Sequence, residues 1–366
     1  MSVVDEMTGR QAAVHQWRGV IEEYRSWLDL PADIPAMTLG EGGTPLVASH
    51  WLSDLTGGEV WLKVEGDNPT GSFKDRGMTT AMSVAKAEGA QACVCASTGN
   101  TSASMAAYAA KSRMKPLVLV PQGKISAGKM AQAIVHGAQV IMVRGNFDDC
   151  LTISRAMAEK YPVALVNSVN PARLQGQKTA SFEVVDRLGD APDYHLLPVG
   201  NAGNISAYWM GYKEYADAGR TSKRPVMRAF QAEGASPLVT GQPFPEPETV
   251  ATAIRIGNPA SWKLADAAAA ESGGRFAAVT DDQILAAQRD LARNDGVFVE
   301  PASASGIAGM LSELDQGESY QGKTVVITVT GHGLKDVDTA LSSFTDLVDT
   351  VIDADVDAAA RAAGLV

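Results

Sequence analysis

The sequence has few cysteines, no long apolar run and a deficit of positive charge. Its 366 residues include only three cysteines, Cys93, Cys95 and Cys150, and these show no paired spacing. That pattern argues against a disulfide framework or a zinc motif, and it is typical of proteins kept in a reducing compartment. No segment has the length of a membrane span, and the first residues lack the apolar run of a signal peptide. We therefore expect a cytoplasmic protein.

The excess of acidic residues limits the kinds of partner that the protein is expected to bind. The chain has 31 Lys and Arg against 42 Asp and Glu, a formal net charge of −11 and a pI of about 5.0. Nucleic acid or an anionic membrane would require a broad basic face, so neither is expected as a partner. A small anionic substrate is compatible with this charge, because a few N–H groups and one arginine can bind a phosphate locally. The five histidines show no metal-ligand spacing, so no metal is expected.

Apolar runs and helical patterns alternate along the chain with short connections. The length suggests two structural units. Strands are predicted at 59–65, 91–97, 116–121, 139–144, 163–168, 194–199, 226–232 and 324–330. Helices are predicted at 11–30, 74–89, 101–113, 127–137, 147–161 and 174–188. Because the strands are continuously apolar, they indicate a mostly parallel sheet covered by helices on both faces, and the expected fold class is α/β.

The first segment with chemical potential is NPTGSFKDRG, residues 68–77. It places Lys74 where a loop turns into a helix, close behind a predicted strand. The partial positive charge of a helix N-terminus disfavours an ammonium, so the pKa of Lys74 should be lowered, as a Schiff-base amine requires. A solvated surface lysine balanced by Asp75 is the alternative, and the spacing alone slightly favours it.

Three further segments also follow predicted strands. STGNTSAS (97–104) combines hydroxyls with the free N–H groups of a helix start, which suits a carboxylate or serves simply as a helix cap. GNAGN (200–204) can turn successive N–H groups toward a phosphate. TGHGLKD (330–336) follows the last predicted core strand. Ligands of open parallel sheets bind at the carboxyl ends of strands, so the four segments should meet along one edge.

One motif resembles a nucleotide-binding site. GKISAGKM (123–130) matches a nucleotide-binding P-loop except that Met130 stands where Ser or Thr is needed. Without that hydroxyl the magnesium ligand is missing, so nucleotide-triphosphate binding is not favoured. Lys124 and Lys129 are interpreted as loop and helix-surface residues.

In chain order, several segments together resemble the fold-type-II pyridoxal-phosphate (PLP) enzymes, the tryptophan synthase β-like group. They are EGGTPL (41–46), NPTGSFKDRG, STGNTSAS, NSVNPARLQGQK (167–178), PVGNAGN (198–204) and TGHGLKD. NPARLQGQK and GHGLKD favour the threonine synthase family within that group. The resemblance implies two open, mostly parallel sheets covered by helices, with the active site between a larger and a smaller domain. The implied division is 1–63 for the N-terminal helix and part of the large domain, 64–168 for the small domain, 169–348 for the large domain and 349–366 for the tail.

The resemblance also implies pyridoxal 5'-phosphate as cofactor and a role for individual residues. Lys74 would hold the cofactor covalently, with Phe73 beside it; Asn100 would bind its phenolic oxygen and Thr330 its pyridine nitrogen. The cofactor phosphate would be bound by Gly200, Asn201, Ala202, Gly203 and Asn204. The substrate carboxylate would be bound by Ser97, Thr98 and Thr101. The substrate phosphate would be bound by Asn167, Ser168 and Arg173, with Lys124 as a further candidate.

The implied reaction converts O-phospho-L-homoserine and water into L-threonine and phosphate, by γ-elimination and then β-addition of water. Lys74 would be the general base, the small domain would close over the substrate, and a homodimer is the family expectation. One alternative is a threonine or serine dehydratase, which would not need Arg173. Another is a non-catalytic ligand-binding relative, which should lack the lysine.

Overall fold

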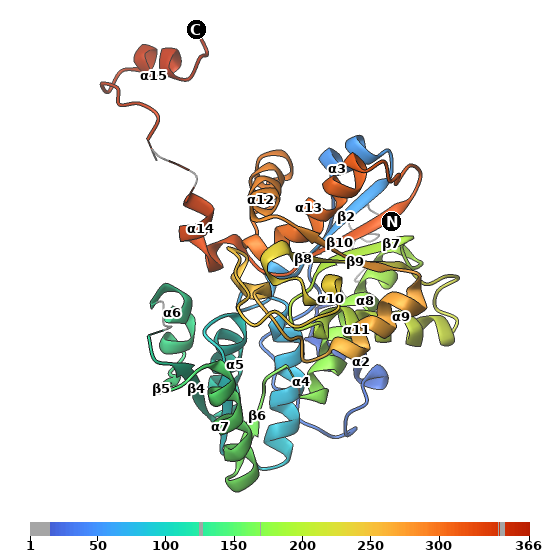
Figure 1. Cartoon of the computed structure of the whole chain (residues 1–366), viewed down its shortest axis with the longest axis vertical. Coiled ribbons are helices and arrows are strands. Elements are labelled where there is room, and N and C mark those ends of the chain that lie inside the picture. The colour runs from blue at the N-terminus through green and yellow to red at the C-terminus, as the bar shows by residue number, and fades with distance from the viewer. Residues whose placement is uncertain (1–14, 124–126, 169, 343, 345–347) are drawn as a thin grey trace, which may run out of the picture.

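Two sheets organise the chain (Figure 1). The computed structural model describes residues 15–123, 127–168, 170–342, 344 and 348–366. The larger sheet has the strand order β1-β2-β10-β7-β8-β9, and all neighbours are parallel except β1 and β2. Its strands are β1 (Leu46–Ala48), β2 (Glu59–Val64), β7 (Tyr194–Pro198), β8 (Val226–Ala232), β9 (Arg275–Val279) and β10 (Thr324–Val329).

The smaller sheet has the order β5-β4-β3-β6 and is wholly parallel. Its strands are β3 (Ala92–Ala96), β4 (Lys115–Pro121), β5 (Gln139–Val143) and β6 (Val163–Leu165). The helices of the N-terminal half are α2 (Val20–Tyr24), α3 (His50–Thr56), α4 (Lys74–Ala87), α5 (Asn100–Ser112), α6 (Ala127–Val135), α7 (Phe147–Lys160) and α8 (Pro171–Leu188). Those of the C-terminal half are α9 (Gly203–Asp217), α10 (Pro237–Thr240), α11 (Trp262–Ser272), α12 (Asp281–Asp295), α13 (Pro301–Asp315), α14 (Val337–Leu341) and α15 (Val356–Ala362).

Apolar side chains cover both faces of each sheet. On β7, Leu196 packs into a core with helices α12 and α13, whereas its neighbour Leu197 packs into a second core with α8 and α9. This alternation follows from the two-residue period of a strand. In the smaller sheet, Cys93 and Cys95 share one core and Val94 lies in the other. The predicted α/β class, with helices on both faces of mostly parallel sheets, is confirmed.

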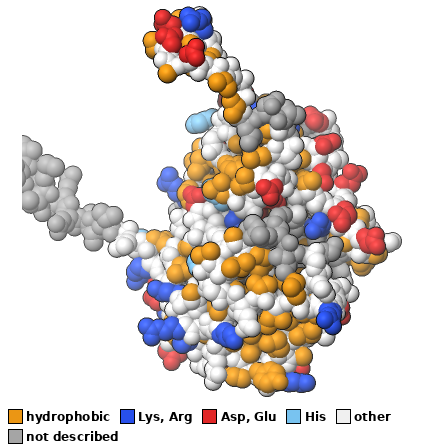
Figure 2. Space-filling view, turned by 90° about the vertical axis from the view of Figure 1, so that its left-hand side faces the viewer, with side chains coloured by type: hydrophobic (Ala, Val, Ile, Leu, Met, Phe, Trp, Pro, Cys, Tyr) orange, Lys and Arg blue, Asp and Glu red, His pale blue; other side chains and the backbone are white. Residues whose placement is uncertain are grey.

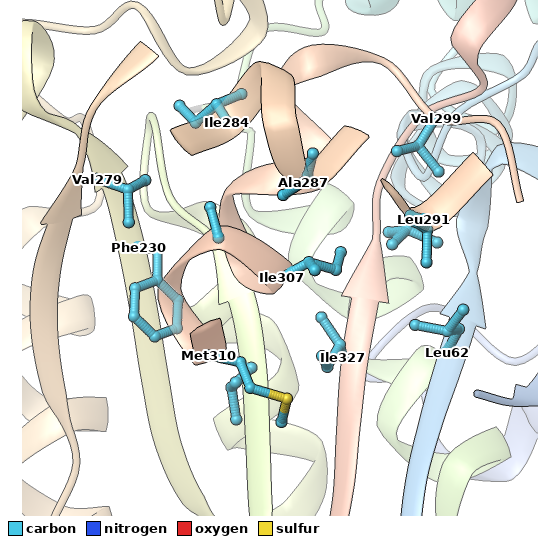
Figure 3. Close-up of a cluster of buried hydrophobic side chains, with 14 of the residues drawn as sticks. Leu62, Phe230, Val279, Ile284, Ala287, Leu291, Val299, Ile307, Met310 and Ile327 are labelled. Atoms are coloured by element: carbon cyan, nitrogen blue, oxygen red, sulfur yellow. The ribbon is translucent and has the colours of Figure 1, made fainter. Parts of the chain in front are cut away.

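Helix α13 is central to the larger sheet. Figure 3 shows Ile307 and Met310 of this helix in one cluster with Ile327 of β10 and Leu291 of α12. All four side chains are fully buried. Because α13 is fixed from several sides, polar residues in its first turn occupy a defined position.

The predicted helix 11–30 is wrong in extent. In the described part of this range, helix is confined to α2 and a 3-10 turn at Arg25–Trp27. Gly19 precedes α2 with a φ of 95°, and a Cβ there would lie 2.1 Å from Oγ1 of Thr38. The close approach of the Thr38 loop therefore requires the glycine, and it sets where the helix begins.

The C-terminal helix α15 stands away from the body and exposes acidic and basic side chains, as Figures 1 and 2 show. None of its residues is buried. Among the described residues, no helix is long and apolar enough to cross a membrane. The division at residues 63/64, 168/169 and 348/349 stays a prediction.

Candidate active site

The four segments all follow the carboxyl ends of strands, and several contacts join them. The backbone N–H of Phe73 donates to the carbonyl oxygen of Thr330 at 3.0 Å, and Ser72 forms a bridge with Gly331. These contacts place the segment after β2 beside the segment after β10. The expected meeting of the Lys74 and Thr330 segments is therefore present in the structure.

A second set of contacts joins the smaller sheet to the larger one. The side-chain amide of Asn100, at the start of α5, donates to both carboxylate oxygens of Glu300 at 3.1 and 3.0 Å. Asn201, in the glycine loop, donates to Oγ of Ser168 at 2.9 Å. Loops that follow strands of the smaller sheet therefore contact loops of the larger sheet, close to the segments that carry Lys74 and Thr330.

Lys74 is the first residue of α4, and its environment favours the neutral amine. Its Nζ lies 3.8 Å from the centroid of the Phe73 ring. Burial and then the charge of Arg173 lower the pKa of Lys74 to about 7, although Glu300 acts in the opposite direction. An amine with a pKa near neutrality is available both as nucleophile and as base.

The alternative of a surface lysine balanced by Asp75 does not hold. The Asp75 carboxylate accepts hydrogen bonds from the backbone and hydroxyl of Thr70, both at 2.7 Å, and from Oγ of Ser104 at 2.5 Å. Asp75 is completely buried. Its oxygens therefore fasten the first turn of α4 to the preceding loop and to α5.

A buried ion network lies directly behind Lys74. Arg76 pairs with Glu65 at 2.6 Å and with Glu183 at 2.5 Å, and Lys63 also pairs with Glu183 at 2.6 Å. Burial opposes ionisation of Glu183, but Arg76 and Lys63 outweigh it and lower the pKa of Glu183 to about 2. The network joins β2, α4 and α8, so the helix that carries Lys74 is held rigidly.

Arg173 is a buried cation that has no carboxylate partner among the described residues. It is 1% exposed, its Nη1 donates to the carbonyl of Val166 at 3.2 Å, and its Nε has no hydrogen-bond partner among the described residues. Burial lowers the pKa of Arg173 to about 10, so the guanidinium still carries its charge at neutral pH. A buried, unpaired charge is costly unless a counter-ion joins it. The position is therefore suited to an anion, and it is close enough to Lys74 to influence its pKa.

The other residues predicted for the substrate phosphate have different surroundings. Both amide atoms of Asn167 are bonded to the backbone of Ala96, at 3.1 Å each, so this side chain extends the pairing of β3. The hydroxyl of Ser168 accepts from Asn201. Lys124 lies outside the described residues, as does part of the P-loop-like segment.

The start of α5 differs from the expected hydroxyl cap. Its N-cap residue is Gly99, which makes no side-chain capping bond, and Oγ of Ser97 accepts from the Gly99 N–H at 3.2 Å instead. Thr98 and Thr101 are half-buried beside it. The first N–H groups of α5 thus have no side-chain acceptor within the described ranges, which leaves the helix start suited to a carboxylate.

The glycine loop meets the requirements of a phosphate site. Ala202 is the N-cap residue of α9, has a φ of 64° and makes no side-chain capping bond. The side chain of Asn204, in the first turn of α9, is buried next to Tyr208. A fifteen-residue helix with an uncapped start offers its N–H groups to an anion.

Sequence reasoning missed two residues of this region, Glu300 and Ser303. Glu300 is buried, and that burial raises the pKa of its carboxyl group. Ser303 lies in the first turn of α13, where its Oγ is 2.9 Å from Oγ1 of Thr330. A partial signal was available, because an acidic residue followed by proline and small residues predicts a helix start.

These observations fit the cofactor that the resemblance implies. The low-pKa amine of Lys74, the uncapped helix start at 203 and the hydroxyl of Thr330 match, in turn, its aldehyde, phosphate and ring nitrogen. Arg173 is not needed for any of these cofactor groups, so it is a candidate site for a second anion.

Known proteins agree with this interpretation. The family model described as pyridoxal-phosphate dependent enzyme matches residues 37–331. The threonine synthase of Mycobacterium leprae is 57% identical over 350 residues, which is 95% of this chain and 97% of that protein. The threonine synthase of Synechocystis sp. is 52% identical over 356 residues, 97% of this chain and 93% of that protein.

Solved structures share the fold at low sequence identity. Maize serine racemase has a TM-score of 0.72 and 20% identity, and the match covers 90% of this chain and 97% of that one. The processed form of threonine deaminase isoform 2 from Solanum lycopersicum has a TM-score of 0.70 and 21% identity, covering 82% of this chain and 86% of that one. These likenesses concern the fold alone.

Proposed function

The chain belongs to the pyridoxal-phosphate dependent enzymes and, within them, to the threonine synthases, and we propose that Lys74 and Arg173 are the centre of its active site. Its reaction converts O-phospho-L-homoserine and water into L-threonine and phosphate. The observation that carries the proposal is the buried guanidinium of Arg173, which pairs with no carboxylate in the described part of the chain and lies beside the low-pKa amine of Lys74. A dehydratase acting on threonine has no substrate phosphate and would have no use for such a cation.

The cofactor is placed by four groups of this chain. Lys74 holds it covalently, with the Phe73 ring against the amine. The N–H groups of 200–204 bind its phosphate, Asn100 its phenolic oxygen and Thr330 its ring nitrogen. When bound, pyridoxal phosphate supplies an electron sink that stabilises negative charge on the substrate carbons.

Lys74 also moves the protons. With a pKa of about 7, its amine would accept a proton from Cα of the substrate, release it, and later accept one from Cβ. Protons return to Cγ and Cα as the product forms, so the amine ends the reaction in its starting state. Arg173 contributes in two ways, because it binds the leaving phosphate and also keeps the pKa of Lys74 low. Phosphate departure and proton transfer are thereby linked through one buried charge.

The substrate is oriented from its other end by the start of α5. The uncapped N–H groups there, with the hydroxyls of Ser97, Thr98 and Thr101, bind the carboxylate. Two separated anion sites, one at α5 and one at Arg173, fix both ends of O-phospho-L-homoserine. This arrangement orients the reacting carbons and excludes water until phosphate has left.

Three finer points belong to the same proposal. Residues 64–168 form a small domain that closes over the substrate, and the Asn100–Glu300 hydrogen bonds are one contact between it and the large domain. A location in the cytoplasm is supported by three buried cysteines that are all unpaired. A homodimer is supported by large exposed apolar side chains on neighbouring elements, such as Val135 and Met142, and sedimentation of the holoenzyme tests it.

Gly203 offers a test of the cofactor phosphate site. A Cβ at this position would meet no atom closer than 3.8 Å, so an added side chain starts without a clash with the backbone. We expect Gly203→Leu to weaken cofactor binding about ten- to a hundred-fold, because charge-assisted hydrogen bonds worth about 1.5–3 kcal/mol are blocked. Titration of the apo-protein with PLP measures this. Gly203→Ala is the matched control and should bind nearly normally; equal affinity of the leucine variant would place the phosphate elsewhere.

The pH dependence of cofactor capture tests the environment of Lys74. Only the neutral amine reacts, so the rate at which apo-protein takes up PLP should rise with pH through a midpoint near 7. The positive charge of Arg173 disfavours the ammonium, and Arg173→Met should therefore move the midpoint to higher pH. Stopped-flow absorbance measures the rate. Arg187→Met, on the exposed side of the same helix, is the control, and an unmoved midpoint in Arg173→Met contradicts the coupling.

The reaction itself is tested by following phosphate release and threonine formation from O-phospho-L-homoserine. Phosphate and threonine should appear in equal amounts. Release of phosphate with a keto acid in place of threonine would contradict controlled water addition. Rapid deamination of threonine without phosphate release would favour the dehydratase instead.

A further inference from the structure

Ser303 makes four polar contacts behind Thr330. Its Oγ accepts the backbone N–H of Thr330 at 3.0 Å and that of Gly331 at 2.8 Å. The same oxygen lies 2.9 Å from Oγ1 of Thr330 and 3.3 Å from the carbonyl oxygen of Gly331. Ser303 is completely buried and Thr330 is 4% exposed, so bulk water does not replace these partners.

The protons of this cluster can be assigned by counting. A serine hydroxyl has one hydrogen and two acceptor lone pairs. The two backbone N–H groups occupy both lone pairs of Ser303, so its remaining role is to donate. Of its two acceptors, Oγ1 of Thr330 is the closer, and the Gly331 carbonyl already accepts from the N–H of Glu300 at 3.0 Å. Ser303 therefore donates to Thr330.

We infer that Ser303 is a positioning residue that makes the Thr330 hydroxyl a hydrogen-bond donor to the cofactor's pyridine nitrogen and so keeps that nitrogen unprotonated. Because Oγ1 of Thr330 accepts from Ser303, its own hydrogen is free to point at the cofactor. If Oγ1 accepted a second hydrogen bond, from a pyridinium, that buried hydrogen would have no acceptor among the described residues. The opposite arrangement, in which Thr330 accepts from a pyridinium and donates to Ser303, would give Ser303 three donors for two lone pairs.

The cluster is held in a fixed geometry. Ser303 lies in the first turn of α13, whose later residues Ile307 and Met310 are packed against the larger sheet (Figure 3). On the other side, Gly331 lies so close to Glu300 that a Cβ at Gly331 would be 2.4 Å from a carboxylate oxygen. Neither Ser303 nor the 330–331 backbone has room to turn away. The direction of the hydrogen bond is thus set by the fold.

This inference rests on the proposed contact between Thr330 and the cofactor, and a spectroscopic test separates the two. The holoenzyme is loaded with PLP labelled with 15N in the ring, and the nitrogen resonance is recorded by NMR between pH 6 and 9. We expect the resonance of an unprotonated, hydrogen-bonded pyridine throughout this range. A pyridinium resonance in the unaltered protein overturns the inference without any variant.

Substitutions at Ser303 and at a control position then test whether Ser303 keeps the ring nitrogen unprotonated. Ser303→Ala removes the donor to Thr330, which can then accept, so the 15N resonance should move toward that of pyridinium. Ser305→Ala is the matched control, because Ser305 is equally buried on the same helix but donates to the carbonyl of Ala302 and does not contact Thr330. If Ser303→Ala gives the same spectrum as the control, the inference is wrong. Ser303→Cys, a weaker donor of similar size, should give an intermediate resonance if the alanine variant loses its cofactor.

The underlying contact is tested by Thr330→Val in the same experiment. If this variant retains PLP with an unchanged nitrogen resonance, Thr330 does not contact the ring and the proposed site is wrong at that point. If Thr330→Val changes the resonance but Ser303→Ala does not, the contact is correct and only the role of Ser303 fails.

Discussion

Lys74→Ala is expected to abolish turnover of O-phospho-L-homoserine while leaving the fold intact. General-base catalysis alone typically contributes about 100- to 10,000-fold, and the covalent attachment of the cofactor is lost as well. The substitution removes a desolvated amine without a salt bridge among the described residues, so thermal stability should not fall. Activity assays and melting curves measure the two effects.

The position of the covalent link gives an independent readout. Borohydride reduction followed by peptide mapping should place the pyridoxyl group of the unaltered protein on Lys74 and find none in Lys74→Ala. Lys86→Ala is the matched control, because Lys86 is exposed in the last turn of the same helix. Label on Lys63 would contradict the assignment most directly, since its Nζ is 2.6 Å from Glu183 and enclosed by protein.

The fold could be predicted largely because buried parallel strands are apolar on both faces. The strand predicted at 226–232 is observed as β8 with the same bounds, and the one at 194–199 as Tyr194–Pro198. The short antiparallel β1 was not predicted: three residues of strand carry almost no periodic signal. The helix predicted at 11–30 is too long. Its start is set by Gly19, where only a glycine leaves room for the side chain of Thr38, and this contact joins residues that are distant in sequence.

The sequence predicts some residues of the candidate site, and others depend on contacts between distant parts of the chain. Lys74, Thr330 and the loop 200–204 lie in short motifs with local geometry, so the sequence points to them. Glu300 and Ser303 act through the packing of α13 against the end of β10, and no local pattern shows which loop that helix meets. Asn167 lies in a recognisable motif, yet its amide is bonded to Ala96 in a contact that only the pairing of β3 and β6 creates.

Arg173 should distinguish a phosphate-recognising enzyme from a dehydratase. A two-pronged, charge-assisted contact contributes about 1.5–3 kcal/mol, so Arg173→Met should lower kcat/KM for O-phospho-L-homoserine about ten- to a hundred-fold. Methionine keeps much of the buried volume and leaves no unpaired charge, so the melting temperature should change little. Arg173→Lys keeps the charge but not the planar fork and should recover part of the activity.

The decisive comparison uses two substrates and one control variant. Any slow deamination of serine or threonine has no phosphate to bind, so at a pH well above the midpoint of Lys74 it should survive in Arg173→Met. Arg187→Met, exposed near the end of the same helix, should leave both reactions unchanged. If both activities fell together in Arg173→Met with PLP still bound, the guanidinium would be structural, and its bond to the Val166 carbonyl would be its main role. Selective loss of the phosphate-releasing reaction is the expected result, because only that substrate supplies the anion that this buried cation lacks.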